Sequence, residues 1–339
     1  MFQRLALVIS FALATGTATA EPDLARLNTD AVNGHILPLV DSFQSAASAL
    51  QTAAEDNCEA TSPALVAAFH DAVDAWTRMS HLRFGPTEKD DRAFAIAFWP
   101  DSRGKTPKEL TVLLKSDEPA FMDATSFAEV SIAARGVYAL EFLLFDARVQ
   151  SVGTAEASCH LIQAIARDIA RNADAIATDW ASYAELILSP SETGPYRNDA
   201  EAAQEFYKAL STGLQFTSDT RLGRPLGTFE KPRAARAELR RSGRSLRQVR
   251  LSLEGTRDLA LILAQDAPAL QAQLDALYMV AFEVADGLDD PVLAGVADPQ
   301  GRLRVEILQM SVDQIRSLIG AELGPALGVA AGFNALDGD

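Results

Sequence analysis

Apolar residues recur at helical spacing along most of the chain, and this periodicity limits the fold more than any other feature. Spacings of three and four residues place such side chains on one face of a helix. The clearest examples are Val32, Ile36, Leu39, Phe43, Ala46 and Leu50; Leu65, Phe69, Val73 and Trp76; and Leu161, Ile165, Ile169 and Ile176. Alternating β-branched and aromatic runs bounded by hairpin turns are scarce. The sequence therefore predicts an all-α protein.

Pro- and Gly-rich stretches divide this helical pattern into two parts. The main interruption is SPSETGP at 189–195, so we expect an N-terminal bundle over 21–190 and a C-terminal bundle over 191–339, each of about four helices and packed together. Residues 232–253 are predicted to form one helix. Residues 83–107 and 287–301 lack a helical pattern, and loops of that length often lie over a functional site.

The first twenty residues have the pattern of a cleavable secretory signal. Arg4 precedes an apolar run over 5–13, and Ala18-Thr19-Ala20 comes before Glu21. No cysteine lies near that junction, so a lipid anchor is not expected. Beyond the signal no apolar stretch reaches the roughly 18–20 residues that a membrane span needs. We expect a soluble periplasmic protein whose mature chain starts at Glu21 and has no transmembrane segment.

The chain is strongly acidic, with a formal net charge of −16 that becomes −17 without Arg4. Nucleic acid is a poor partner for such a protein. Its two cysteines, Cys58 and Cys159, allow only one intramolecular pairing, and a disulfide persists in exported proteins. We expect a Cys58–Cys159 bridge, with a pair of buried thiols as the alternative.

Basic residues are concentrated in one stretch, 221–250, which holds ten of them and only two carboxylates. They are Arg221, Arg224, Lys231, Arg233, Arg236, Arg240, Arg241, Arg244, Arg247 and Arg250. On a helix, Arg240 and Arg244 would lie in one cationic stripe with Arg236 and Arg247. This stripe would either bind an anion, such as a chelated metal or a lipid phosphate, or neutralise carboxylates of the same chain. The second interpretation is favoured because 46 acidic residues need partners.

Aromatic and charged residues also gather around the predicted loop 83–107. Trp76 precedes this loop, and Arg83, Trp99, Asp101 and Arg103 lie within it. Such side chains beside irregular backbone are candidates for lining a cleft.

Histidines offer a weaker signal for a metal site. His70, Asp74 and His81 share one helical stripe and could face a metal ion, with His81 the stronger candidate. The competing explanation is the ordinary polar face of a surface helix. Near the C-terminus, Asp337 and Asp339 flank a glycine and could bind a hard cation, although termini are commonly solvated.

The run ARGVYALEFLLFD at 134–146 places Gly136, Tyr138 and Glu141 in a strongly apolar helical segment. Tyr138 and Glu141 are three residues apart, so they share a helix face and can converge on one ligand. Gly136 allows another backbone or a bound group to come close. The alternative is that Tyr138 and Glu141 bond to each other within the core.

This run resembles the Gly-x-His-x-x-Glu signature of the imelysin-like proteins, also called the M75 peptidase family, with Tyr138 in place of the histidine. Further stretches that resemble the family are HLRFGP (81–86), AFWPD (97–101), GRPLGTF (223–229), RRSGRSLR (240–247) and GFNALDGD (332–339). The similarity covers nearly all of the expected mature chain.

The resemblance implies an all-helical exported protein of two bundle-like halves, with the motif near their junction. It also implies a connection with iron uptake: iron or an iron complex would bind in a cleft between the bundles, and the partners would be iron-uptake components of the cell envelope. Tyr138 and Glu141 would be metal ligands, because tyrosinate suits ferric iron, with His81 a further candidate. Trp76, Arg83, Trp99, Asp101 and Asp337 would line the cleft.

Two other functions remain open at this stage. The family name implies a metallopeptidase, but the absent motif histidine makes catalytic activity doubtful. A non-catalytic interaction protein of the cell envelope would instead use the basic stretch around Arg240 and Arg244 as its contact surface.

Overall fold

The computed structural model of the chain describes residues 22–116 and 124–329. The expected signal segment 1–20 and Asp337 lie outside these ranges. Throughout the described residues the secondary structure is helical, apart from one isolated β-bridge between Thr228 and Lys231. The all-α class is therefore confirmed. None of the helices in the described ranges combines the length and the apolar character that crossing a membrane requires.

The first half of the chain contains nine α-helices among the described residues, of which α9 is the longest. They are α1 (Leu24–Ala31), α2 (Leu37–Asp56), α3 (Pro63–Met79), α4 (Arg92–Ile96), α5 (Lys105–Leu114), α6 (Ala124–Ala128), α7 (Gly136–Phe145), α8 (Ala147–Gln150) and α9 (Ala155–Leu188). A π-helical turn, η1 (Val32–Ile36), joins α1 to α2. The second half contains α10 (Asp199–Gln215), η5 (Phe216–Leu222), α11 (Gly223–Leu226), η6 (Ala234–Arg236), α12 (Ser245–Leu263), α13 (Pro268–Asp286), α14 (Pro299–Leu318) and α15 (Gly324–Leu327).

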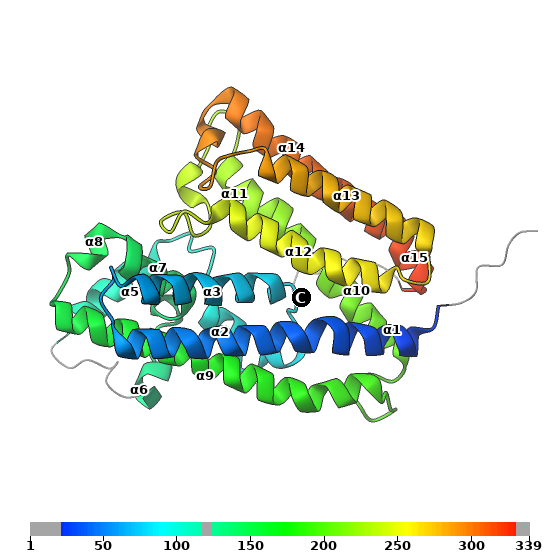
Figure 1. Ribbon diagram of the computed structural model, residues 1–339, viewed down its shortest axis with the longest axis horizontal. Helices are drawn as coiled ribbons and strands as arrows, with labels where there is room; N and C mark the ends of the chain where they lie inside the picture. Colours follow the sequence, from blue (N-terminus) through cyan, green and yellow to red (C-terminus); the bar gives the residue numbers. More distant parts are fainter. Residues whose placement is uncertain (1–21, 117–123, 330–339) are drawn as a thin grey trace, which may run out of the picture.

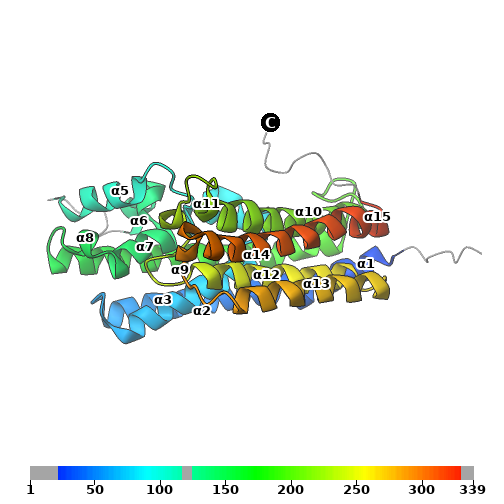
Figure 2. The same cartoon turned by 90° about the horizontal axis from the view of Figure 1, so that it is seen from above.

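The long helices form two groups packed against each other. In the first group, α2 and α7 pack with α9, and α3 packs with α2 and α7; in the second, α10, α12, α13 and α14 pack with one another. Figure 1 shows α2, α3 and α9 of the first group in its lower part and α12, α13 and α14 of the second above them. Figure 2 shows that the long helices of both groups run along the long axis of the molecule. Two bundle-like halves are thus present, while a domain boundary at residue 190 stays a prediction.

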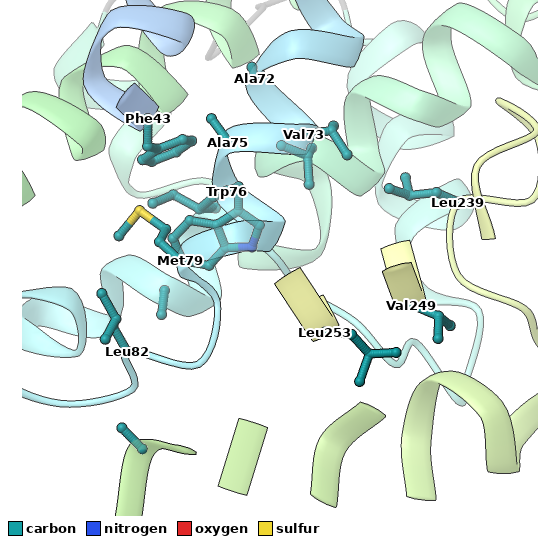
Figure 3. Packing of buried hydrophobic residues seen from close by; sticks show 14 of the residues in the cluster. Phe43, Ala72, Val73, Ala75, Trp76, Met79, Leu82, Leu239, Val249 and Leu253 are labelled. Atoms are coloured by element: carbon teal, nitrogen blue, oxygen red, sulfur yellow. The ribbon is translucent and has the colours of Figure 1, made fainter. Parts of the chain in front are cut away.

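The two groups meet where α3 crosses α12. A Cβ atom at Gly255 of α12 would lie 2.1 Å from the carbonyl oxygen of Arg78, so only glycine permits this close approach. Apolar side chains continue across the crossing. Figure 3 shows Phe43 of α2 near Trp76 and Met79 of α3, with Val249 and Leu253 of α12 in the same buried cluster. One hydrophobic core therefore extends through both groups.

A disulfide links Cys58, just after α2, to Cys159 in the first part of α9, and the two residues are 101 positions apart in sequence. The pairing expected from the sequence is the one that the structure contains. Closing so long a loop lowers the entropy of the unfolded chain, an effect of about 2–4 kcal/mol for typical disulfides.

The predicted helix over 232–253 is wrong in its first half. Only η6 is helical there, residues 237–244 form turns, and α12 begins at Ser245. Leu239 and Gly243 have φ angles of 46° and 74°, which a right-handed helix cannot contain. The arginine stripe through Arg240 and Arg244 therefore does not form. We call residues 237–244 the anchored segment, because the motif helix holds it in place, as described below.

The predicted irregular stretch 83–107 contains more helix than expected. Two 3₁₀ turns, η2 (Gly85–Thr87) and η3 (Lys89–Asp91), precede α4, and α5 begins at Lys105. Asp90 and Asp91 adopt left-handed backbone conformations, which keep each helical piece short. The intervening residues 97–104, which include Trp99, remain irregular.

Candidate functional site

A pocket of about 410 Å³ lies at the junction of the two helix groups. Its walls come from the C-terminal end of α3, the irregular segment around Trp99, the motif helix α7, and α10 with η5. Five residues that the sequence analysis proposed as metal ligands or cleft-lining residues contribute to this lining: Trp76, His81, Arg83, Trp99 and Tyr138. The structure thus brings together residues from three separate stretches of sequence.

Aromatic rings form one wall of the pocket. Trp99 stacks on Tyr138 with ring centroids 6.1 Å apart, and it meets Phe216 edge-on at 5.9 Å. Trp76 and Phe94 also line the pocket. Such faces suit a ligand with flat or apolar surface.

The polar end of the pocket is a buried network centred on Glu238. The Tyr138 hydroxyl donates to one Glu238 oxygen, and Arg221 donates to the other at 2.8 Å. Arg221 also donates to Ser80 and Ser252, at 3.2 and 3.3 Å. Glu238 is 2 % exposed and Arg221 4 %. A buried carboxylate is stable there because both of its oxygens accept hydrogen bonds and a cation balances its charge.

Tyr138 is a neutral hydrogen-bond donor in this network. Burial, and then the negative charge of Glu238, raise its pKa well above the ordinary value of 10.0. The hydroxyl proton points to Glu238, so it is not available as a tyrosinate ligand in this arrangement. Neither the expected Tyr138–Glu141 ligand pair nor the alternative Tyr138–Glu141 hydrogen bond is what the structure shows.

Glu141 faces the anchored segment instead of the pocket. One oxygen accepts from the backbone N–H and the hydroxyl of Ser242, at 3.0 and 2.9 Å. Arg241 lies 3.8 Å from its other oxygen and also pairs with Asp146 at 2.8 Å. Burial raises the pKa of Glu141 above its ordinary value, although these hydrogen bonds act in the opposite direction. Tyr138 and Glu141 therefore converge on one segment of chain, through Glu238 and Ser242, and not on one ligand.

Gly136 explains how α7 can begin so close to the end of α4. Its φ is 74°, and a Cβ there would lie 2.2 Å from the carbonyl oxygen of Ile96 and 2.4 Å from that of Ala95. Of the two neighbours expected from the sequence, a backbone or a bound group, the structure shows the backbone. This contact places the motif helix beside the segment that carries Trp99.

His81 lies beyond the end of α3, where its Nε2 is 2.9 Å from Nε2 of His35 in η1. Burial lowers the pKa of His35 to about 4 and that of His81 well below 6.5, so both rings are neutral near pH 7. His70 stacks on Phe145, and Asp74 pairs with Arg244 and Arg247. The expected stripe of His70, Asp74 and His81 therefore does not assemble as a metal site.

The other candidate residues, Asp101, Arg240 and Arg244, bond to neighbouring parts of the same chain. Asp101 caps α5 by accepting from the backbone of Lys105 and Thr106, at 2.9 and 2.8 Å, so it does not line the pocket. Arg244 is committed to Asp74, and Arg240 donates to the carbonyl of Ala235 at 3.1 Å. Arg244 therefore neutralises a carboxylate of the same chain, which is the interpretation of the basic stretch that the sequence favoured.

A bare metal ion has no ready set of ligands here. Across residues 22–116 and 124–329, no group of three or more His, Cys, Asp or Glu side chains is close enough to hold one. Glu238 is already engaged by Tyr138 and Arg221, and His81 by His35. The side chains that are present do not fit a resident metal centre.

Sequence reasoning missed the centre of the network, Glu238 and Arg221. One signal was available: Glu238 is one of only two carboxylates among the ten cations of 221–250. An isolated acid in such a stretch, next to the apolar Leu239, indicates a buried ion pair. Its partner on α7 could not be inferred, because Tyr138 is 100 residues away in sequence.

Known proteins resemble this chain in sequence and in fold. Iron-regulated protein A of Synechococcus elongatus is 24% identical over 297 residues, which cover 82% of this chain and 78% of that protein. The crystal structure of an imelysin-like protein from Psychrobacter arcticum matches with a TM-score of 0.76 at 17% identity, over 91% of this chain and 97% of the other. The likeness to that structure establishes the fold. The imelysin (peptidase M75) family model matches residues 36–319, and the chain therefore belongs to the imelysin family.

Proposed function

We propose that this protein is an exported, periplasmic member of its family that binds an iron complex in the pocket between the two helix groups. The observation that carries the proposal is the pocket itself: aromatic walls enclose about 410 Å³ around a closed polar network. That volume lies within the range of about 300–1,000 Å³ that is typical of small-molecule sites. It far exceeds the space of a single ion.

The chemistry of the walls favours a complex over a bare ion. A naked ferric or zinc ion needs several oxygen, nitrogen or sulfur ligands from the protein, and the described residues do not gather such a set. An iron complex brings its own donor atoms and presents an organic surface. Trp99, Tyr138 and Phe216 would contact that surface, and Arg221 and Glu238 would fix the position of Tyr138.

Three further observations support an iron-related role outside the cytoplasm. The relative from Synechococcus elongatus is named for its regulation by iron. The first twenty residues of this chain have the composition of a secretory signal, and the Cys58–Cys159 disulfide suits an oxidising compartment. Iron-uptake components of the cell envelope are the partners that we propose.

Equilibrium dialysis of the purified mature protein would test this proposal, with iron measured by elemental analysis. The probes are ferric citrate, the ferric hydroxamate complex ferrioxamine B, and uncomplexed ferrous and zinc ions. We expect saturable binding of at least one ferric complex and weaker binding of the free ions. Trp99→Ala should reduce binding of that complex by about tenfold, because stacking on an aromatic wall is lost.

A matched control is Phe229→Ala, which removes an aromatic ring that is 71% exposed and does not line the pocket. Binding in this control should equal that of the unaltered protein. The proposal fails if no ferric complex binds, or if Trp99→Ala and Phe229→Ala behave alike. Tight binding of free zinc with hydrolysis of a denatured protein would instead favour the metallopeptidase alternative.

A further inference from the structure

Apart from Arg221, which pairs with Glu238, the basic stretch divides into a first part whose cations have no carboxylate partner and a second part whose arginines do. From Arg241 onward each arginine has a carboxylate partner: Arg241 pairs with Asp146, Arg244 and Arg247 with Asp74, and Arg250 with Glu254 and Asp286. Five cations that precede Arg241 form no ion pair with any described residue. They are Arg224, Lys231, Arg233, Arg236 and Arg240, and we call them the unpaired cations.

Unpaired cations are unexpected in a chain with 46 carboxylates and a net charge of −16. The two acidic residues close to them in sequence do not neutralise them. Glu238 is buried and bound to Arg221 and Tyr138, and Glu230 pairs with none of them among the described residues. A local positive field therefore remains on an acidic protein, and such a field attracts anions.

Arg224 lies beside a residue of the pocket wall, and Arg236 belongs to the neighbouring segment, because α11, which carries Arg224, packs against η6, which ends at Arg236. The guanidinium of Arg224 lies over the ring of Trp99, 5.9 Å from its centroid, and Trp99 lines the pocket. The buried Nε of Arg224 has no hydrogen-bond partner. Burial, and then the positive charge of nearby Arg236, lower the pKa of Arg224. An anion between the two guanidiniums would relieve their repulsion and accept from both.

We infer that Arg224 and Arg236 recognise anionic oxygens of the ligand, so that the pocket selects negatively charged iron complexes with carboxylate- or phosphate-like groups. This inference rests on the proposed function and specifies its ligand class. The planar guanidiniums donate to the anionic oxygens, while Trp99 and Tyr138 contact the body of the complex. Neutral and cationic complexes lack the groups that Arg224 and Arg236 would bind.

The test compares complexes of opposite charge by equilibrium dialysis against the mature, disulfide-bonded protein. Ferric citrate is the anionic probe, and ferrioxamine B, which carries a positive charge, is the cationic one. We expect ferric citrate to bind more tightly by about tenfold or more, and Arg236→Gln to remove about tenfold of that affinity. Raising the ionic strength should weaken ferric citrate binding in the unaltered protein more than in Arg236→Gln.

Arg236→Gln is the informative variant because Arg236 is exposed and its side chain has no protein partner among the described residues. Arg304→Gln is the matched control, since it removes one equally exposed arginine from α14, whereas Arg236 lies in the segment that packs against α11 and Arg224. Arg224→Lys keeps the charge but loses the flat group over Trp99, and it should bind ferric citrate with intermediate affinity.

The inference is overturned if ferrioxamine B binds as tightly as ferric citrate, or if Arg236→Gln and Arg304→Gln bind ferric citrate alike. Titration with citrate alone separates this outcome from a failure of the proposed function. If neither iron complex binds but citrate binds and requires Arg236, the anion site stands and the iron proposal falls. If citrate also fails to bind, both are wrong.

Discussion

Tyr138 and Glu141 lie one turn apart on α7, are both buried, and both contact the anchored segment, yet they have different surroundings. Tyr138 borders the pocket and donates to Glu238 within a network that Arg221 completes. Glu141 has no pocket surface and accepts from Ser242 beneath Arg241. The two polar positions of one motif therefore have different roles. Tyr138 forms part of the pocket wall, whereas Glu141 holds the anchored segment in place.

Both residues depend on how α7 begins, so Gly136→Ala should have the largest effect. The added Cβ would meet the carbonyl oxygens of Ile96 and Ala95 at a positive φ. We expect a loss of about 3–5 kcal/mol in the free energy of unfolding, measured by urea denaturation, together with weaker ligand binding. Gly328→Ala is the control, because Gly328 has a φ of 67° and no atom within 4 Å of the added Cβ. Equal losses in the two variants would show that the backbone contact is unimportant.

Glu141→Ala should separate the two roles. It leaves the Ser242 N–H and Arg241 without their carboxylate, so we expect about 2–4 kcal/mol lower unfolding free energy. Because the pocket walls do not include Glu141, ligand affinity per folded molecule should change by less than about threefold. Glu283→Ala, at an exposed position, serves as the control. A large loss of affinity with unchanged stability would reverse the assignment of roles and revive Glu141 as a ligand.

Tyr138→Phe should give the opposite pattern. Loss of the hydroxyl removes one hydrogen bond to Glu238, while Arg221 remains, so the unfolding free energy should fall by only about 1 kcal/mol. Binding of the iron complex should fall by about threefold or more, because Glu238 is then free to move into the pocket. Tyr183→Phe removes a hydroxyl that pairs with Tyr196 outside the pocket and is the control. If both phenylalanine variants bind equally well, Tyr138 is only structural.

The smallest effect concerns the charge of Glu141 and appears as a pH dependence. In the folded protein the pKa of Glu141 is raised from its ordinary value of 4.5. Between pH 4.5 and this raised pKa, the folded state therefore binds more protons than the unfolded state. As the pH rises through this range, the unfolding free energy falls, because Glu141 must ionise in a buried position. Glu141→Gln keeps the oxygen that accepts from Ser242 but cannot ionise. Its unfolding free energy relative to the unaltered protein should therefore rise with pH above about 4.5 and then level off once the Glu141 carboxyl is ionised in the folded protein.

Denaturant titrations at several pH values would measure this difference. A relative stability that stays flat between pH 4 and 7 would contradict the raised pKa. Tyr138→Phe is a useful comparison, because the pKa of Tyr138 is raised from 10.0 and its ionisation affects stability only in alkaline solution.

Several parts of this arrangement could be predicted from the sequence, because they depend on local patterns. Three-and-four spacing specified the all-α class, and two cysteines allowed one pairing. The aromatic and charged residues around Trp99 were named as cleft-lining, and Trp76, Arg83 and Trp99 do line the pocket. These predictions needed only periodicity, composition and the clustering of residue types near irregular backbone.

The remaining features depend on contacts between distant parts of the chain. Helical spacing cannot reveal that Leu239 and Gly243 take left-handed conformations, which turn a predicted arginine stripe into the anchored segment. Nor can it show that Tyr138 meets Glu238 instead of Glu141. The sequence shows which side chains can form a polar network, but tertiary packing selects the partners.

The Cys58–Cys159 disulfide separates the residues that line the pocket into two groups according to their position in the chain. Trp76, His81, Arg83, Trp99 and Tyr138 all lie between the two cysteines in sequence, whereas Phe216, Arg221 and Glu238 lie beyond them. One wall of the pocket thus belongs to a covalent ring of the chain, and the opposite wall does not. Reduction would open that ring and leave the chain of the other wall unchanged, so it offers a way to alter the connectivity of one wall without substituting a residue of the pocket.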